Sequence, residues 1–162
     1  MDGSVTVATH AGAVERCYRE QAERLWRSLL LFSGNREVAN DAVAEAFAQA
    51  LRRGDEIRDL DRWVWRAGFR IAAGELALRQ SSPGSLTAAH DVGVEMPAST
   101  VDLVRAMTRL SPKQRGAVVL HHYAGYSNRE TARILGSTTA AVGVHLERAR
   151  RRLRELLEDD DG

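Results

Sequence analysis

A run of arginines near the C-terminal end is the strongest concentration of one chemistry in this sequence. The run lies in residues 148–154, and the block 111–157 carries nine Lys or Arg against three Asp or Glu, a net charge of +6. Residues 1–110 carry 14 basic and 15 acidic side chains, so they are nearly balanced. Guanidinium groups bind phosphate oxygens through charge-assisted hydrogen bonds. The block 111–157 is therefore the candidate surface for a nucleic acid.

Three helices are expected to position these arginines. The pair Ser111-Pro112 predicts the start of a first helix, which Gly125 ends. Residues 127–130 read Ser-Asn-Arg-Glu, a capping box that opens a short helix ending at Gly136. The pair Ser137-Thr138 then caps a long third helix.

The third helix of this block is amphipathic. Its apolar side chains recur at spacings of four and three residues, which places them on one face and leaves the arginines on the others. Helix, tight turn, short helix, turn and long basic helix is the order of a helix-turn-helix. An ordinary three-helix bundle with a solvated arginine face is the alternative. The apolar residues are Val142, Leu146, Ala149, Leu153 and Leu156.

The first half of the chain also has helical periodicity. It predicts a helix from about Ala13 to Leu31 and a second from Arg36 to Arg53, with Asn35 as N-cap. A third is expected to start at Asp59 or Asp61 and to run to about residue 80.

The remaining segments predict how the helices are grouped. Residues 81–99 lack helical periodicity and contain Ser, Pro and Gly, which is typical of a flexible linker. We expect an all-α fold of two small helical domains joined by this linker, the C-terminal one a helix-turn-helix. The domains span residues 13–80 and 100–157, with a flexible tail at 1–12 and an acidic tail at 158–162.

Several classes of function are not expected. The histidines have no Cys or carboxylate partners at metal-binding spacing, and no Gly-rich phosphate loop follows a strand, so we predict no metal, no cofactor and no enzyme. The single cysteine, Cys17, is expected to be a small core residue in a reducing compartment. No apolar run is long enough for membrane insertion, which favours a cytoplasmic protein.

The C-terminal block resembles domain 4 of bacterial RNA polymerase sigma factors, most of all the small extracytoplasmic-function (ECF) type. The resemblance rests on residues 110–115 (LSPKQR), 126–132, Leu135-Gly136 and 146–153 (LERARRRL). It implies that the third helix enters the major groove at the −35 promoter element. The residues that it assigns to −35 DNA are Arg129, Thr138, Thr139, Gly143, His145, Arg148, Arg151 and Arg152.

Three positions of this helix depart from the family pattern. Gly143 and Val144 stand where the family usually has a basic or hydroxyl residue, and His145 replaces an arginine. Neither Gly nor Val offers a hydrogen bond to a base. We therefore expect base reading to be weaker, or to shift toward Thr139, His145 and Arg148.

The first half resembles domain 2 of the same family. Residues 35–37 and 41–47 resemble its polymerase clamp-binding helix, which implies that Asp41, Glu45 and Phe47 bind core RNA polymerase. Residues 63–66 (WVWR) resemble the start of its promoter-reading helix, with Trp63 rather than Trp65 as the packing residue. The residues that this assigns to −10 DNA are Ile57, Arg58, Arg62, Arg66 and Arg70, the last standing where the family typically has Asn.

The resemblance implies a sigma factor whose partners are core RNA polymerase (clamp and flap regions), promoter DNA and an anti-sigma factor. Two other hypotheses remain open at this stage. One is a helix-turn-helix transcription regulator that does not act as a sigma factor. The other is a protein-interacting helical module that has lost DNA binding, for which Gly143 and Val144 would be the symptoms.

Overall fold

A computed structural model describes residues 3–80 and 98–160 of the chain, and these residues contain helices but no strand. The all-α fold expected from the sequence is confirmed. The first half forms α1 (Gly3–Ser33), α2 (Arg36–Arg53), a 3-10 turn η1 (Gly54–Glu56) and α3 (Leu60–Gln80). The second half forms α4 (Ala98–Thr108), α5 (Pro112–Val118), the π-helical turn η3 (Val119–Tyr123), α6 (Asn128–Leu135) and α7 (Thr139–Asp160).

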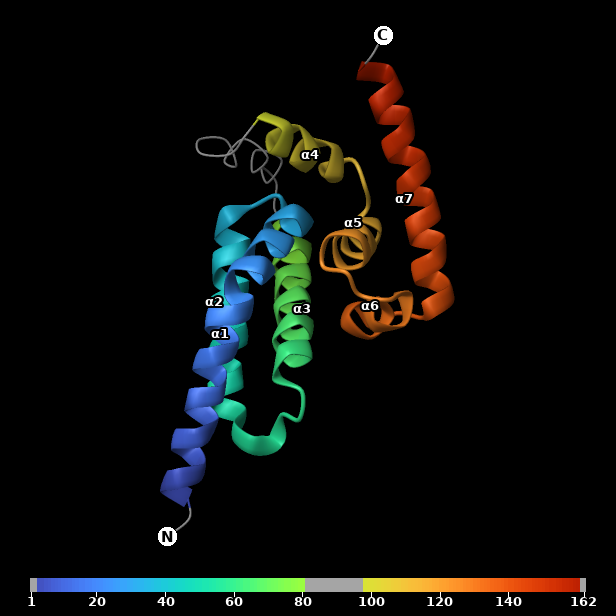
Figure 1. Cartoon of the computed structure of the whole chain (residues 1–162). Helices are drawn as coiled ribbons and strands as arrows, with labels where there is room; N and C mark the ends of the chain where they lie inside the picture. Colours follow the sequence, from blue (N-terminus) through green and yellow to red (C-terminus); the bar gives the residue numbers. More distant parts are fainter. Residues whose placement is uncertain (1–2, 81–97, 161–162) are drawn as a thin grey trace.

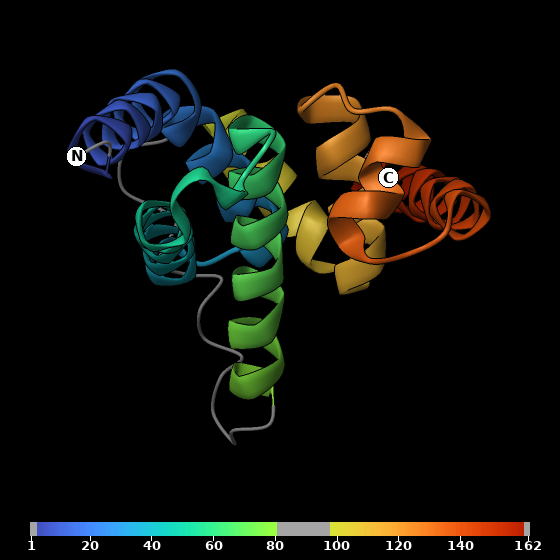
Figure 2. The same cartoon turned by 90° about the horizontal axis from the view of Figure 1, so that it is seen from below.

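The helices form two groups that lie side by side. Figure 1 shows α1, α2 and α3 packed along one another, with α5, α6 and α7 beside them and α4 across one end. Seen from below, α3 stands between α1 and α2 on one side and the C-terminal helices on the other (Figure 2). The groups touch directly, because α3 contacts α6 and α1 contacts both α5 and η3.

The predicted helix caps are present. The Asn35 side chain accepts from Val38 N at the start of α2, and Asp59 Oδ1 accepts from Arg62 N at the start of α3. The capping boxes at Ser111 and Ser127 both form, and Gly136 ends α6 in the left-handed conformation (φ 65°). These local signals fix where α2, α3, α5 and α6 begin or end.

Two predicted ends differ from the structure. α1 begins at Gly3, so residues 3–12 continue this helix and do not form the expected tail. α7 reaches Asp160, so most of the predicted acidic tail is also helical. A helix can extend at either end without a recognisable cap residue. For this reason the sequence analysis missed both extensions. The predicted linker lies outside the described residues, apart from Ala98 and Ser99, with which α4 begins.

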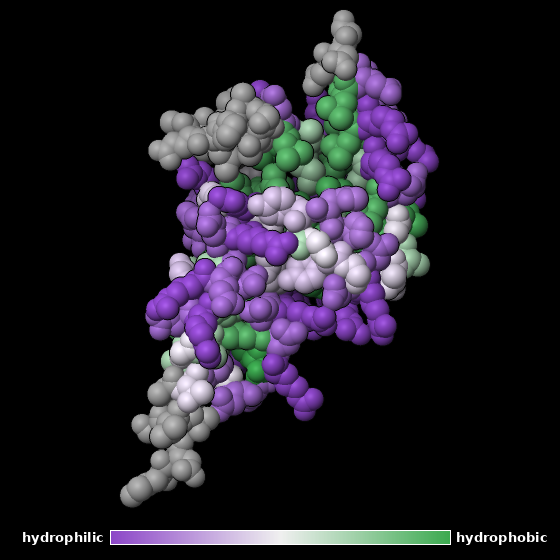
Figure 3. Space-filling view, in the orientation of Figure 1, coloured by the Kyte–Doolittle hydropathy of each residue, from purple (hydrophilic) through white to green (hydrophobic). Residues whose placement is uncertain are grey.

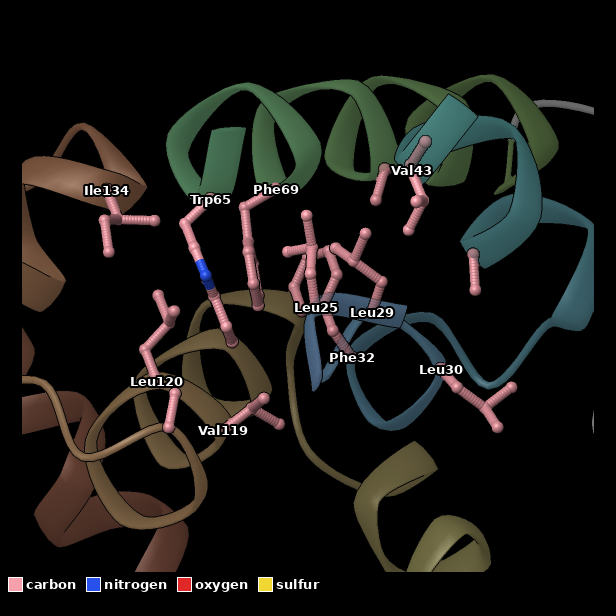
Figure 4. Close-up of a cluster of buried hydrophobic side chains, with 14 of the residues drawn as sticks. Leu25, Leu29, Leu30, Phe32, Val43, Trp65, Phe69, Val119, Leu120 and Ile134 are labelled. Carbon is pink, nitrogen blue, oxygen red and sulfur yellow. The ribbon is translucent and has the colours of Figure 1, made fainter. Parts of the chain in front are cut away.

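The hydrophobic core runs through both groups of helices. Leu25, Leu29 and Phe69 from the first group are buried together with Leu120 from the second (Figure 4). Trp65, not Trp63, is the fully buried tryptophan, which corrects the sequence-based assignment. The reason is the second group: the Trp65 ring meets the Tyr126 ring edge-on, with centroids 5.4 Å apart.

Polar contacts join the two groups as well. The buried Arg115 donates from Nε to Phe32 O at the end of α1 and from a terminal nitrogen to Leu110 O, both at 2.7 Å. The Arg24 guanidinium donates to Ala124 O. Burial lowers the pKa of Arg115, and the two carbonyl oxygens supply the hydrogen bonds that its charge needs in the interior.

Candidate nucleic-acid interface

The start of α7 is held by a threonine cap and an apolar stripe. Thr138 Oγ1 accepts from Ala141 N at 3.1 Å, which satisfies one of the free N–H groups of the first turn. Val142, Leu146 and Ala149 are buried against α5 and α6. Because these three face inward, the opposite side of the helix faces solvent. Thr138 and Thr139 are exposed, as a groove-entering N-terminus requires.

Gly143 is half-buried on a flank of α7 and lines an open groove with Ser127 and Asn128. A Cβ atom built on Gly143 would meet nothing within 4 Å, so the glycine is not needed for close helix packing. Gly116 in α5 is the opposite case, because a Cβ there would lie 2.9 Å from Leu135 Cδ2. Gly116 therefore allows α5 and α6 to approach closely.

His145 is half-buried and lies toward the start of α5. Burial and then the charges of Lys113 and Arg148 lower the pKa of His145. The imidazole is therefore mainly neutral at pH 7 and has one N–H donor and one acceptor. His145 thus lies beside Lys113, on the opposite flank of α7 from Gly143.

The arginines of α7 are exposed along its outer side. In Figure 3, hydrophilic residues cover the outer edge of the C-terminal part of α7, and white and green residues lie nearer its start. Arg152 lies 3.3 Å from Glu155, and Arg150 lies 3.9 Å from Glu147, so both pairs are loose surface contacts. Arg148 and Arg151 are exposed as well, and the row is available to phosphate groups.

Arg129 stands in the first turn of α6. It is exposed, and the neighbouring Ser127 and Glu130 side chains cap the helix through Glu130 N at 3.1 Å and Ser127 N at 3.0 Å. The predicted −35 residues thus come from the starts of α6 and α7 and from the outer side of α7, all within the C-terminal group of helices.

Two of the three predicted −10 residues of α3 face the second group of helices. Arg62 and Arg66 line a groove with Tyr126, Glu130 and Arg133 of the C-terminal group. The Arg62 guanidinium lies 2.8 Å from Glu130 Oε1 and 3.3 Å from Asp59 Oδ2. Arg62 is therefore already engaged within the molecule.

The other predicted −10 residues are spread along the first group. Arg58 and Arg70 are exposed, one in the turn before α3 and the other two helical turns after Arg62. Ile57 is half-buried and packs on the core, so its side chain anchors the turn after η1.

The predicted polymerase-binding residues divide into two kinds. Asp41 is exposed on α2, and Glu45 lies one helical turn further on, 2.9 Å from an Arg52 nitrogen. Hydrogen bonds from Gln49 and Arg52 lower the pKa of Glu45. Phe47 is 5% exposed and meets Tyr18 edge-on at 5.0 Å, so it packs beneath this surface, and its role in polymerase binding stays a prediction.

Comparison with known proteins places these surfaces in a family. Residues 100–153 match the family model described as Sigma-70, region 4. The chain is 30% identical over 157 residues to the ECF RNA polymerase sigma factor SigM of Mycobacterium tuberculosis, covering 93% of this chain and 80% of that protein. The chain belongs to the ECF RNA polymerase sigma factors. These matches do not favour a helix-turn-helix regulator that is not a sigma factor.

Other relatives agree with this membership. The ECF RNA polymerase sigma factor BldN of Streptomyces coelicolor is 29% identical over 167 residues, which cover 94% of this chain and 63% of BldN. The chain therefore spans less than two thirds of BldN.

Solved structures show the same fold. The sigma factor RpoE in complex with the anti-sigma factor NepR from Bartonella quintana matches with a TM-score of 0.74 and 22% identity, covering 89% of this chain and 96% of that one. CnrH in complex with the cytosolic domain of CnrY matches with a TM-score of 0.71 and 21% identity, covering 97% of this chain and 95% of CnrH.

Two residues of this ECF sigma factor escaped the sequence reasoning. The sequence marks Arg115 only as part of the LSPKQR run, although this residue is the buried link to Phe32. Tyr126 directly precedes the Ser127 cap, and an apolar residue there is a signal for packing onto a neighbouring element. Neither signal identifies a partner that lies some 60 to 80 residues away in sequence.

Searches for other kinds of site concern the described residues alone. Among residues 3–80 and 98–160, no group of three or more His, Cys, Asp or Glu is placed to hold a metal ion. Nor does any helix in those ranges have the length and apolar character needed to cross a membrane. Cys17 is buried and donates to Asp61 Oδ1 at 3.1 Å, and its pKa is raised to about 12, chiefly by burial, so it is the core residue expected.

Proposed function

We propose that this ECF sigma factor directs core RNA polymerase to promoters by placing α7 in the major groove of the −35 element. The observation that supports this most is the outward side of α7, where an exposed capped N-terminus is continuous with exposed arginines. Thr138 and Thr139 would contact base edges, while Arg148, Arg151 and Arg152 hold phosphates. Arg129 adds a phosphate contact from the first turn of α6.

The −10 element is proposed to bind along α3 and the turn before it. Arg58, Arg66 and Arg70 are exposed on this path, and Arg62 joins them once it leaves Glu130. Ile57 would form an apolar wall for an unstacked base. Binding at −10 therefore requires that α6 moves away from α3, at least at the Arg62–Glu130 pair.

Core polymerase is proposed to bind two further surfaces. Asp41 and Glu45 on α2 would pair with arginines of the polymerase clamp. A groove between α5 and the C-terminal half of α7, lined by Val118, Leu153 and Leu157, would take an apolar segment of the flap. Leu157 is 64% exposed, and an apolar side chain so open is suited to a protein contact.

A regulatory partner and a cellular location are part of the same proposal. The solved RpoE structure contains the anti-sigma factor NepR, and we propose that an anti-sigma protein also binds this chain. We propose that this chain acts in the cytoplasm, together with polymerase and promoter DNA. RNA synthesis is carried out by the polymerase, and this chain is proposed to contribute binding and no catalytic group.

Charge reversal on α2 tests the polymerase contact. The double variant Asp41→Arg, Glu45→Arg should bind core polymerase at least tenfold more weakly at low salt, and the difference should shrink as salt rises. Glu15→Arg, Glu23→Arg is the matched control, because it makes the same charge change at exposed positions of α1. Equal polymerase affinity of the two double variants would remove the α2 assignment.

A further inference from the structure

Two apolar residues, with a glycine on the flank beside them, occupy the face of α7 that points outward from the helix-turn-helix. Ala140 and Val144 are four residues apart on the side opposite Val142, Leu146 and Ala149, and Gly143 is half-buried next to them. Val144 is 47% exposed and Ala140 is also exposed. Single exposed apolar residues are common on protein surfaces. Here they lie within the first two turns of α7, at the end that is proposed to enter DNA.

This face has a definite chemistry toward base pairs. In the major groove, the 5-methyl group of thymine is the apolar feature, and side chains such as Ala contact it directly. Val144 offers two methyl groups and no hydrogen bond. Because Gly143 lacks a side chain and the space above it is open, the helix backbone can lie close to the base edges beside Val144.

The neighbouring charged residues begin one turn beyond this apolar patch. Glu147 follows Val144 by three residues and lies 3.9 Å from Arg150. Arg148 follows Val144 by four residues, so it lies on the same face one turn further along α7. The first two turns of the outward face therefore lack a guanidinium for guanine and instead present methyl groups.

We infer that Val144, supported by Ala140, reads the −35 element by contact with the 5-methyl group of thymine. The inference rests on the proposed placement of α7 in the −35 major groove and names what that helix recognises. Val144 is thus a specificity-determining residue, and Gly143 sets the close approach that brings it to the base.

Uracil substitution tests the inference, because uracil differs from thymine only in lacking the methyl group. The holoenzyme is first used to select its preferred −35 sequence from a randomised promoter duplex. Each thymine of that sequence is then replaced by uracil, and holoenzyme affinity is measured. Burial of one methyl group predicts a loss of about fourfold at one or two positions. Uracil placed in the spacer between the two elements is the DNA control.

The variant Val144→Ala locates the effect on the protein. Its response to uracil should fall below about 1.5-fold at the same positions, while its melting temperature stays unchanged, because the residue is exposed and Ala favours a helix. Leu51→Ala, at a 53% exposed apolar position on α2, should keep the full response.

Three outcomes are decisive. Loss of the uracil response in Val144→Ala alone supports the inference. An equal response in wild type and Val144→Ala, or no response at any −35 thymine, overturns it while leaving the proposed function intact. A chain that fails to form holoenzyme, measured separately by co-purification with core polymerase, overturns the proposed function and this inference with it.

Discussion

Arg62 on α3 and Arg148 on α7 are both exposed arginines on helices proposed to bind DNA, but their surroundings differ. Arg62 lies 2.8 Å from Glu130 of the other group of helices and lines a groove between the two groups. Arg148 is exposed on α7, a helix that Figure 1 shows on the side of the C-terminal group away from α3. The proposed −10 surface is thus partly occupied within the molecule, and the proposed −35 surface is open.

The difference shows that the two proposed DNA-binding surfaces of one chain can differ in how accessible they are. The occupied side is held by a continuous core, by Arg115 and by the Trp65–Tyr126 contact. The open side belongs to α7, which packs on α4, α5 and α6 through its other face. Substitutions at the contact between the groups should therefore change stability, and replacement of the exposed arginines of α7 should change DNA affinity with little effect on stability.

The largest effect is expected from Arg115→Met. This change leaves the buried Phe32 and Leu110 carbonyl oxygens without their donor, and each unsatisfied acceptor costs about 1–3 kcal/mol. We expect a loss of about 2–4 kcal/mol in the free energy of unfolding, measured by denaturant titration. Arg109→Met, at an exposed position, should cost less than about 0.5 kcal/mol. Equal losses would show that Arg115 does not hold the two groups together.

Two glycines provide the next contrast. Gly116→Ala forces a Cβ toward Leu135 and should cost about 1–3 kcal/mol through overpacking. Gly143→Ala adds a methyl group that meets open space at an interior position of α7. This change should stabilise the protein by about 0.5–1 kcal/mol, because alanine favours the helix. Thermal unfolding of the two variants gives the sign of each change. Destabilisation by Gly143→Ala would mean that this side of α7 is packed and not open.

Removal of two arginines from α7 should affect DNA binding without unfolding. Arg148→Ala, Arg151→Ala is expected to weaken promoter binding roughly tenfold at moderate salt and to flatten the slope of log affinity against log salt by about one unit per lost phosphate contact. The loss should be uniform across −35 sequences, since phosphates carry no sequence information. A loss confined to one sequence would instead indicate base contacts.

The smallest effect concerns the Arg62–Glu130 pair. The Ser127 backbone N–H, together with weaker contributions such as the Arg62 charge, holds the pKa of Glu130 below its ordinary value of 4.5. Its contribution to stability is therefore present above that value and is lost as the pH falls through the lower folded pKa. Glu130→Gln keeps the capping box but removes the charge. Wild type should melt slightly above this variant at pH 7, and the gap should close in acid; a gap independent of pH would exclude the charge as its source.

The sequence predicted the parts of this fold that local rules control. Asn35, Asp59, Ser111 and Ser127 cap helices as expected, because a cap depends on neighbours three residues away. The roles of Trp65 and Arg115 depend on Tyr126 and Phe32, which are distant in sequence, so periodicity within one helix could not assign them. Phe47 shows the same limit, since its motif position did not reveal that Tyr18 covers it.

The sequence could predict the surroundings of the proposed DNA-contacting residues only in part, again because packing between distant segments is not encoded locally. Thr138, Thr139 and Arg148 lie on exposed faces because one amphipathic helix determines its own outer side. The engagement of Arg62 by Glu130 joins positions 68 residues apart and follows only from the packing of α6 on α3. The individual DNA and polymerase contacts stay predictions.

Transcription by reconstituted holoenzyme tests the central claim most directly. Core RNA polymerase is incubated with this chain and a fragmented genome, and the 5′ ends of the transcripts are mapped. We predict a discrete set of start sites that share a −35 element, with initiation at all of them reduced by Arg148→Ala, Arg151→Ala. Initiation no different from that of core polymerase alone would contradict the assignment of this chain as a promoter-directing sigma factor.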